Sequence, residues 1–165
     1  GGDRSAHLLN AAEFGADVVK IEPPGHGDPL RKWRCMKDGT SVWWHVQSRN
    51  KRSVAVDLRQ PDGQGIARAL AEKADIVVEN FRPGTLEEWG LGYDAIAAKN
   101  PGVIMIRISG YGQTGPYASR PGFGVIGAGI MGVNRQRCGI ERAQRHALGI
   151  MVVIGRHVAR QPPLA

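Results

Sequence analysis

Four short runs of apolar, largely β-branched residues constrain this 165-residue chain most strongly, because helix-like or loop-like segments separate them. Such runs, bounded by glycine, proline and polar residues, are typical of strands. Strands that alternate with helices are joined by right-handed crossovers, which favour a mostly parallel sheet with helices on both faces. The sequence therefore predicts an α/β fold. The predicted strands are 17–22, 53–58, 75–79 and 103–109.

Helix-like segments lie between these runs. Gly15 stands where a helix commonly ends, and Pro61 stands where the first turn of a helix tolerates proline. The apolar residues that follow Pro61 at helical spacing are expected to share one face. They are Ile66, Ala69, Leu70 and Ala74. The predicted helices are 5–14, 61–74, 85–89 and 93–99.

Two further segments are less regular. Residues 25–50 are rich in glycine and proline, which predicts a loop with Trp33, Trp43 and Trp44 as anchors. Residues 152–154 are apolar and fit a strand or part of a helix, and their pattern does not distinguish the two.

The positive charge is concentrated near the end of the chain. Residues 1–132 hold 16 Lys and Arg against 14 Asp and Glu, whereas residues 133–165 hold six Arg and one Glu. This second segment has no aromatic residue and no lysine. Nucleic-acid-binding surfaces usually combine basic residues with stacking aromatics, so we expect no nucleic-acid partner.

The composition also bears on location and metal binding. No apolar run approaches the ~20 residues of a membrane span, and the first residues lack a basic-then-apolar signal pattern. Cys35 and Cys138 lie far apart, and neither they nor the five histidines show metal-ligand spacing. We therefore expect a cytoplasmic protein with free thiols, no metal site and no membrane partner.

Polar and cationic residues follow the predicted strands, where ligands of α/β sheets collect. Arg59 and Arg82 are suited to phosphates, because a planar guanidinium binds two oxygens at once. Asn80 offers an amide, and Phe81 offers a face for a flat ring. From spacing alone, the same residues are also compatible with ordinary solvated loops and one buried aromatic.

A glycine-rich loop at 110–115 follows the last predicted strand and contains Gly-x-Gly-x-x-Gly. A dinucleotide site also needs a helix directly after this motif and an acidic residue about twenty positions on. Pro116 and Pro121 follow instead, and residues 125–140 contain no carboxylate. We therefore reject a nicotinamide site and expect the glycines to let the backbone approach a ligand or a partner chain closely.

Four sequence blocks, at 15–28, 49–58, 75–84 and 108–116, occur in a recognisable order and spacing. Together they resemble the class III CoA-transferases, a family that includes formyl-CoA transferase, the carnitine CoA-transferase and α-methylacyl-CoA racemase. The resemblance covers about residues 6–132. It implies a Rossmann-like, mostly parallel sheet with flanking helices, a smaller second domain and interlocked homodimers. We expect residues 1–132 to be a partial large domain and residues 133–165 an atypical Arg-rich tail, frame-shifted or disordered.

The resemblance also implies a chemistry. The transferases move CoA from an acyl-CoA to a carboxylic acid through an Asp nucleophile, which forms a mixed anhydride and then an enzyme-bound CoA thioester. The racemases use Asp and His as acid–base partners. CoA or acyl-CoA is a substrate, and no permanently bound cofactor is implied. Carried over by position, Val56 and Arg59 would lie near the adenine nucleotide, and Asn80, Phe81 and Arg82 would line the CoA groove.

The sequence departs from the family pattern where the nucleophile is expected, near residues 150–154. That region reads Gly-Ile-Met-Val-Val-Ile-Gly over 149–155, and no Asp follows Asp94. The family's first strand and second domain are also missing from this sequence. We therefore assign no catalytic residue and expect the chain to be inactive alone. A transferase, a racemase and a non-catalytic or non-functional CoA-binding fragment all stay open. The lack of a histidine beside residues 122–124 favours the transferase over the racemase.

Overall fold

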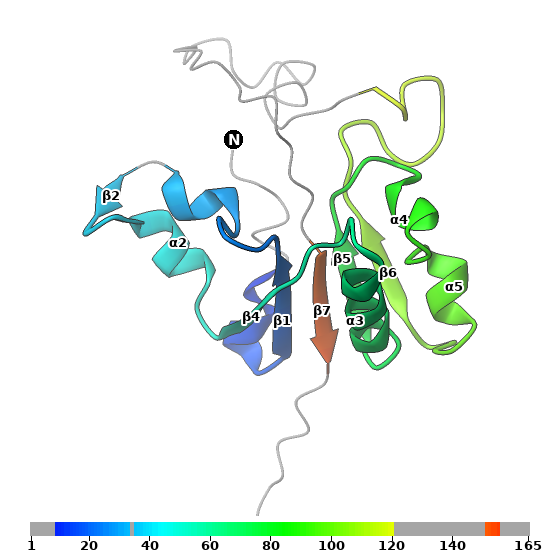
Figure 1. Cartoon of the computed structure of the whole chain (residues 1–165), viewed down its shortest axis with the longest axis horizontal. Helices are drawn as coiled ribbons and strands as arrows, with labels where there is room; N and C mark the ends of the chain where they lie inside the picture. The colour runs from blue at the N-terminus through cyan, green and yellow to red at the C-terminus, as the bar shows by residue number, and fades with distance from the viewer. Residues whose placement is uncertain (1–8, 34, 121–150, 156–165) are drawn as a thin grey trace, which may run out of the picture.

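A five-stranded sheet forms the centre of the computed structural model, which describes residues 9–33, 35–120 and 151–155 (Figure 1). The strand order is β4-β1-β7-β5-β6. β1 runs parallel to β4 and β5 runs parallel to β6, while β7 lies antiparallel between β1 and β5. The predicted α/β fold with a mostly parallel sheet is confirmed. The strands are β1 (Asp17–Glu22), β4 (Lys51–Ala55), β5 (Ile76–Glu79), β6 (Ile104–Arg107) and β7 (Met151–Gly155).

β7 settles the ambiguous apolar segment as a strand. Met151 and Val153 pack into the larger hydrophobic cluster, whereas Val152 and Ile154 pack into a second cluster. A strand at the centre of a sheet is covered on both faces and is therefore apolar on both. This position explains why the segment shows no alternation between apolar and polar residues. Its antiparallel direction was not predicted.

Three of the predicted helices are confirmed with small shifts: α3 (Pro61–Ala71), α4 (Thr85–Glu88) and α5 (Tyr93–Ala97). Of the helix expected at 5–14, the described part is a 3₁₀ helix, η1 (Leu9–Phe14), and residues 5–8 lie outside the described residues. Gly15 follows η1 with a φ of +91°, as expected for a glycine that ends a helical turn.

The buried face of α3 differs from the predicted one. Leu70 is half-buried and Ala74 is buried, but Ile66 is 49% exposed. Ala69 is exposed as well. The fully covered positions within the helix carry small residues, because these let the helix backbone lie close to the sheet. They are Gly63, Ala67 and Ala71.

The prediction that residues 25–50 form one irregular loop was wrong, because the segment contains two short helices and a small hairpin. The Asp28 carboxylate accepts a hydrogen bond from the Leu30 amide at 2.8 Å, and the Ser41 hydroxyl accepts one from the Trp44 amide at 3.2 Å. These side chains cap two short helices, which satisfies amides that a helix start leaves unpaired. Trp44 is buried, as expected of an anchor, whereas Trp33 is 44% exposed. The segment contains η2 (Pro29–Lys32), β2 (Met36–Lys37), β3 (Thr40–Ser41) and α2 (Val42–Gln47).

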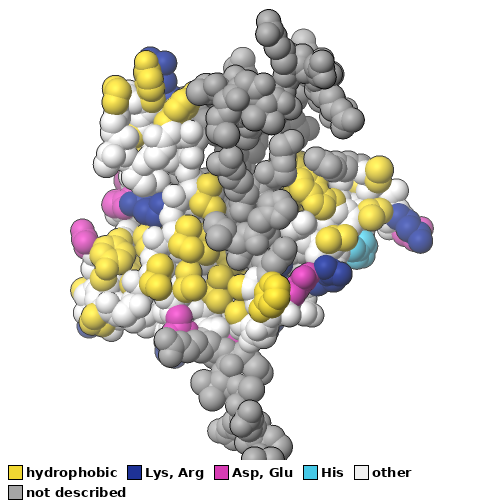
Figure 2. Space-filling model, turned by 180° about the vertical axis from the view of Figure 1, so that it is seen from behind, with side chains coloured by type: hydrophobic (Ala, Val, Ile, Leu, Met, Phe, Trp, Pro, Cys, Tyr) yellow, Lys and Arg dark blue, Asp and Glu magenta, His cyan; other side chains and the backbone are white. Residues whose placement is uncertain are grey.

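The hydrophobic core occupies both faces of the sheet. The larger cluster lies between the sheet and α3, α4 and α5; Figure 1 shows α3 in front of the sheet and α4 and α5 beside it, to the right of β6. The second cluster joins Ala12 of η1 to Val18, Val78, Val152 and Ile154. Figure 2, which views the molecule from behind, shows apolar side chains gathered over this side. None of the helices in the described ranges combines the length and the apolar character that a membrane crossing needs.

Candidate functional site

The four parallel strands β1, β4, β5 and β6 all end at one edge of the sheet, which we call the carboxyl edge. The chain runs outward from β1 to β4 and then crosses to β5 and β6 on the other side. Its direction of winding therefore reverses between β1 and β5, where β7 lies. In open α/β sheets, ligands bind outside the carboxyl ends of the strands at such a switch point. The fold thus places a candidate site beside the ends of β1 and β5.

Glu22 ends β1 with a side chain that is 2% exposed. Its carboxylate accepts hydrogen bonds from the Asp28 amide at 2.9 Å, the Arg31 Nε at 3.0 Å and the Ser53 hydroxyl at 3.0 Å. Burial raises the pKa of Glu22, but the bonds from Arg31 and Asp28 and the charge of Lys20 outweigh it, so the net pKa is lowered. Glu22 is therefore ionised, and its carboxylate links the loop that follows β1 to Ser53 of the neighbouring strand β4.

A hollow of about 250 Å³ opens beside this carboxylate. Gly27 is needed here for two reasons. Its φ is +64°, and a β-carbon at this position would lie 2.7 Å from Arg31 Nε and 2.8 Å from Glu22 Oε2. The glycine thus leaves room for the Arg31–Glu22 ion pair. The hollow is lined by Glu22, Pro23, Gly25, His26, Gly27, Arg31, Ser53 and Ala55.

Trp44 supports this loop from α2. Arg31 Cζ lies 4.1 Å and Lys20 Nζ lies 4.5 Å from the centre of its ring, both within the range of a cation–π contact. The Lys20 ammonium also pairs with Asp28, and both of these side chains are buried. Because buried charges are costly unless they are paired, this pairing keeps the loop between β1 and η2 in one arrangement.

Glu79 ends β5 in a similar way, with a side chain that is 1% exposed. Its Oε1 accepts a hydrogen bond from Arg107 Nε at 2.8 Å, and its Oε2 accepts one from the Phe81 amide at 2.7 Å. Burial raises the pKa of Glu79 above its usual value, despite the opposing bonds from Arg107 and Phe81. Arg107, the last residue of β6, also pairs with Glu87 of α4 at 2.8 Å. A charged network thus joins the ends of β5 and β6.

The residues predicted at 80–82 follow directly and form what we call the 80–82 turn. Phe81 is half-buried, packs against the larger cluster and meets the Trp89 ring edge-on, with the ring centres 5.2 Å apart. Arg82 is exposed, and Asn80 is half-buried. The structure therefore places an exposed guanidinium and an amide side chain at the carboxyl edge, with the aromatic ring serving mainly as their anchor.

The other two predicted residues follow β4. Val56 is buried, and its amide donates a hydrogen bond to the Glu22 carbonyl at 2.8 Å. The Arg59 side chain is 76% exposed, and its Nε and Nη2 bond the two Asp57 carboxylate oxygens at 2.8 and 2.9 Å. The hydrogen bonds from Arg59 lower the pKa of Asp57. A phosphate that binds Arg59 must therefore share the guanidinium with Asp57.

The structure brings the predicted residues to one edge but in two groups. β4 and β5 are separated by β1 and β7, which corresponds to three strand spacings, or about 14 Å. An elongated ligand is therefore required to contact both groups. The sequence reasoning missed Glu22, Glu79 and Arg107. The sequence did contain a signal for the two glutamates: both apolar strands β1 and β5 end in glutamate, which places a carboxylate at the carboxyl edge.

The glycine-rich loop after β6 lies at the same edge. Gly112 and Gly115 adopt φ values of +82° and +97°, a region that favours glycine, and a β-carbon at either would meet nothing within 4 Å. The Ser109 hydroxyl donates a hydrogen bond to the Gly112 carbonyl at 2.7 Å. Glycine is therefore favoured at these two positions by the left-handed backbone and not by a lack of space. The closeness of a ligand or partner chain to them stays a prediction.

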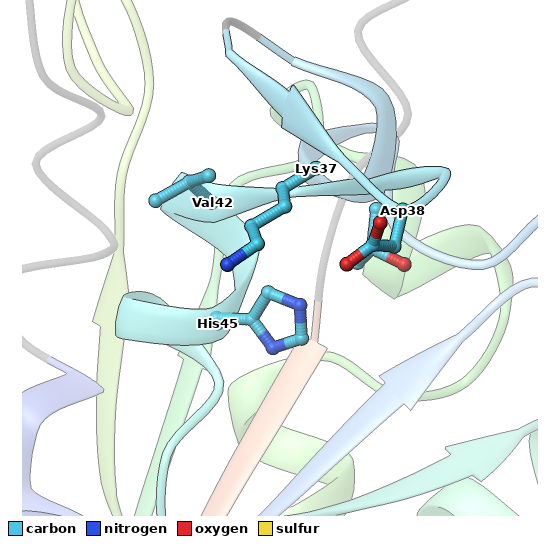
Figure 3. Close-up of a pocket in the computed structure, with 5 residues that line it drawn as sticks. Lys37, Asp38, Val42 and His45 are labelled. Atoms are coloured by element: carbon cyan, nitrogen blue, oxygen red, sulfur yellow. The ribbon is translucent and has the colours of Figure 1, made fainter.

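A second hollow, of about 520 Å³, lies between the β2–β3 hairpin and α2 (Figure 3). Lys37 and Asp38 extend from the hairpin toward His45 of α2, and all three residues are exposed. None of the predicted site residues lines it. In the parts of the chain that the structure describes, no group of three or more His, Cys, Asp or Glu side chains is arranged to hold a metal ion. Cys35 is an exposed free thiol, and Cys138 lies outside the described residues.

The strand order and the polar residues at the carboxyl edge are those of an α/β protein that binds its ligand at a topological switch point. Comparison with known proteins then identifies the family. The sequence model of CoA-transferase family III matches residues 6–160, so this chain belongs to that family. The resemblance of the four sequence blocks is confirmed. The match runs past residue 132 into the Arg-rich segment.

Individual relatives agree with this assignment. Succinyl-CoA--D-citramalate CoA-transferase of Chloroflexus aurantiacus is 56% identical over 123 residues, which are 74% of this chain and 31% of that protein. Succinyl-CoA--L-malate CoA-transferase alpha subunit of the same organism is 48% identical over 135 residues, 81% of this chain and 31% of that protein. A CAIB/BAIF family protein from Brucella suis has a similar structure, with a TM-score of 0.71, 36% identity, and coverage of 80% of this chain and 38% of that one. The chain thus spans about a third of the length of the curated relatives.

Proposed function

We propose that the whole protein transfers CoA from an acyl-CoA to a small carboxylic acid, and that this chain supplies its CoA-binding edge. The observation that carries the proposal is the placement of Arg59, Asn80 and Arg82 at the carboxyl edge of a family III fold. Two guanidinium groups suit the phosphates of CoA, and an amide suits its base or its pantetheine amides. The separation of the two groups suits an elongated molecule.

The relatives' names suggest a substrate class. Both transferases described above are named for succinyl-CoA as donor and for a hydroxylated dicarboxylic acid, citramalate or malate, as acceptor. We propose a dicarboxylic acyl-CoA as donor and a small dicarboxylic acid as acceptor for the whole protein. The same names favour a transferase over a racemase.

The chemistry requires a carboxylate nucleophile that this chain does not supply in the expected place. Attack of an enzyme carboxylate on the thioester forms an anhydride and expels the CoA thiolate, which then attacks the anhydride to give an enzyme thioester and release the donor acid. The expected region holds β7, whose residues from Met151 to Ile154 are apolar and buried. We propose that this chain alone forms no enzyme thioester. Detection of a covalent CoA adduct by mass spectrometry would contradict this.

Three expectations from the sequence stay proposals for the whole protein. They are a cytoplasmic location, assembly into interlocked homodimers, and a boundary near residue 132 between a partial large domain and an atypical tail. One relative is named as an alpha subunit, which supports assembly from more than one chain in that protein. Light scattering from the purified protein at several concentrations would test the oligomeric state.

Calorimetric titration of the 165-residue chain with coenzyme A tests the binding proposal. Arg82→Ala is expected to weaken binding about tenfold or more, since a hydrogen bond to a charged group contributes about 1.5–3 kcal/mol. Lys99→Ala is the matched control, because Lys99 is also an exposed cation but precedes β6 at the opposite edge of the sheet. Equal affinity of all three proteins, or no binding by any, would contradict the proposal.

A further inference from the structure

The buried Glu79 carboxylate joins three parts of the carboxyl edge. It ends β5, its Oε1 bonds Arg107 of β6 at 2.8 Å, and its Oε2 bonds the Phe81 amide at 2.7 Å. Phe81 is the middle residue of the 80–82 turn, which flanks it with Asn80 and Arg82. The two carboxylate oxygens are thus used separately, one toward the neighbouring strand and one toward the turn.

This arrangement is better suited to fixing geometry than to adding stability. A buried ion pair is often no more stabilising than apolar side chains of the same volume, because both charges lose their hydration. A charge-assisted hydrogen bond is short and directional, however. With Arg107 bonded to Oε1 at 2.8 Å and the Phe81 amide bonded to Oε2 at 2.7 Å, both oxygens of the carboxylate are held. Glu87 of α4 holds the other side of the Arg107 guanidinium at 2.8 Å.

The end of β1 carries a related arrangement. Glu22 is also buried at the last position of its strand, but its Oε2 accepts both the Arg31 Nε at 3.0 Å and the amide of a following loop residue, Asp28, at 2.9 Å. The two glutamates flank the switch point between β1 and β5. The similarity indicates a common requirement, that each loop leaving the switch point is held by a carboxylate beneath it.

We propose that Glu79 is a positioning residue for CoA: held by Arg107, it fixes the Phe81 amide and thereby keeps Asn80 and Arg82 in place at the carboxyl edge. This inference rests on the proposed function, since it requires that the 80–82 turn contacts CoA. Glu79 itself is buried beneath the turn and acts through it.

A double-mutant cycle tests the inference with coenzyme A itself as the ligand. Glu79→Gln keeps the size of the side chain but replaces one of the two bonded oxygens with an NH2 group, so in the same orientation it loses the acceptor for either Phe81 or Arg107. We expect Glu79→Gln to weaken CoA binding about tenfold, since the turn loses a charge-assisted bond. Arg82→Ala should then cost much less in the Glu79→Gln background than in the unsubstituted chain, because residues that act as a unit are not additive.

Two controls separate positioning from a general structural role. Glu87→Gln removes the negative charge of the other partner of Arg107 but leaves the Phe81 acceptor, so its CoA affinity is expected to stay within about twofold. The amide proton of Phe81, followed by NMR in the absence of CoA, should shift upfield in Glu79→Gln and little in Glu87→Gln. If Glu79→Gln does not fold, Arg107→Lys takes its place, because it keeps the charge but loses the guanidinium fork.

The outcomes distinguish this inference from the proposed function. Non-additive losses together with a shifted Phe81 amide support it. Additive losses from Glu79→Gln and Arg82→Ala, or an unchanged Phe81 amide, overturn it while leaving CoA binding in place. If the unsubstituted chain does not bind CoA, the proposed function fails, and the inference falls with it whatever the amide shows.

Discussion

Gly63 lies so close to Asp57 that a β-carbon at Gly63 would be 2.1 Å from the Asp57 carbonyl oxygen. The contact joins the first turn of α3 to the segment that follows β4. Asp57 in turn bonds the amide and guanidinium of Arg59, a predicted CoA-binding residue. The glycine therefore allows the helix to approach closely the segment that carries Asp57 and Arg59.

Gly63→Ala is expected to destabilise the protein by about 1–3 kcal/mol or more, because the methyl group would lie 2.1 Å from the Asp57 carbonyl oxygen and 2.9 Å from the Val56 side chain. Gly65→Ala is the matched control in the same helix, since a β-carbon at Gly65 would meet nothing within 4 Å. Alanine is the better helix former, so Gly65→Ala should stabilise by about 0.5–1 kcal/mol. Urea unfolding of the two variants checks the opposite signs. A Gly63→Ala protein as stable as Gly65→Ala would contradict the close approach.

The order of strands and helices could be predicted because each parallel strand has its own apolar pattern and turn signals. The position of β7 could not, since an apolar run at 151–155 carries no information about its neighbours or direction. The face of α3 was also misjudged at Ile66. Hydrophobicity predicts that a large apolar residue is buried, whereas in this helix the close approach at Gly63 selects small residues for the covered face.

The candidate site could be predicted only in part, because sequence patterns indicate strand ends but not burial or contacts between distant residues. Exposed residues at strand ends, such as Arg59 and Arg82, are visible in the sequence as polar residues after an apolar run. Glu22 and Glu79 were less visible, because their importance depends on burial and on partners distant in sequence. Arg107 lies 28 positions from Glu79, and only the pairing of β5 with β6 brings the two together.

The two buried glutamates are expected to give opposite pH dependences of stability. The pKa of Glu22 is lowered in the folded state, so its contribution is present above the unfolded pKa and is lost as the pH falls through the lowered value. The pKa of Glu79 is raised, so the folded state holds its proton more tightly, and stability falls as the pH rises from the ordinary glutamate value of 4.5 through the raised one.

Urea unfolding across a pH series checks this difference. Below the ordinary glutamate pKa, the free energy of unfolding should rise with pH, and Glu22→Gln should make this rise less steep. Above that pKa, the contribution of Glu79 should decline with pH, and Glu79→Gln should remove this decline. Arg107 and Glu87 face Glu79, and, despite burial, the hydrogen bond from Arg107 lowers the pKa of Glu87, so both stay charged above the ordinary glutamate value, where Glu79→Gln is compared. Identical pH profiles for the two variants would contradict the assignment of opposite shifts.

Lys20→Met is expected to destabilise the protein by about 3–5 kcal/mol, because it leaves the buried Asp28 carboxylate without its charged partner. The Trp44 ring also loses a cation 4.5 Å from its centre. Arg52→Ala is the control, since it breaks a pair with Asp17 in which both side chains are exposed. Such pairs contribute about 0–1 kcal/mol. Equal losses of unfolding free energy in the two variants would show that the Lys20–Asp28 pair is hydrated.

Gly27→Ala is expected to separate Arg31 from Glu22. A β-carbon at this position would lie 2.7 Å from Arg31 Nε, so the guanidinium must move away from the carboxylate. Gly25→Ala provides the comparison, because Gly25 also has a positive φ, +79°, but a β-carbon there would meet nothing within 4 Å. Both variants bear the strain of a left-handed residue, about 1–2 kcal/mol, so the difference between them isolates the clash.

Unfolding in urea and the NMR signal of the Arg31 Nε proton measure this difference. Gly27→Ala should lose about 1 kcal/mol more than Gly25→Ala, the approximate contribution of a hydrogen bond. Its Arg31 Nε proton should move upfield as the charge-assisted bond to Glu22 breaks, whereas in Gly25→Ala it should stay in place. If both variants lose the same free energy and leave that proton unshifted, Arg31 has room to adjust around the methyl group, and Gly27 is required for its backbone conformation alone.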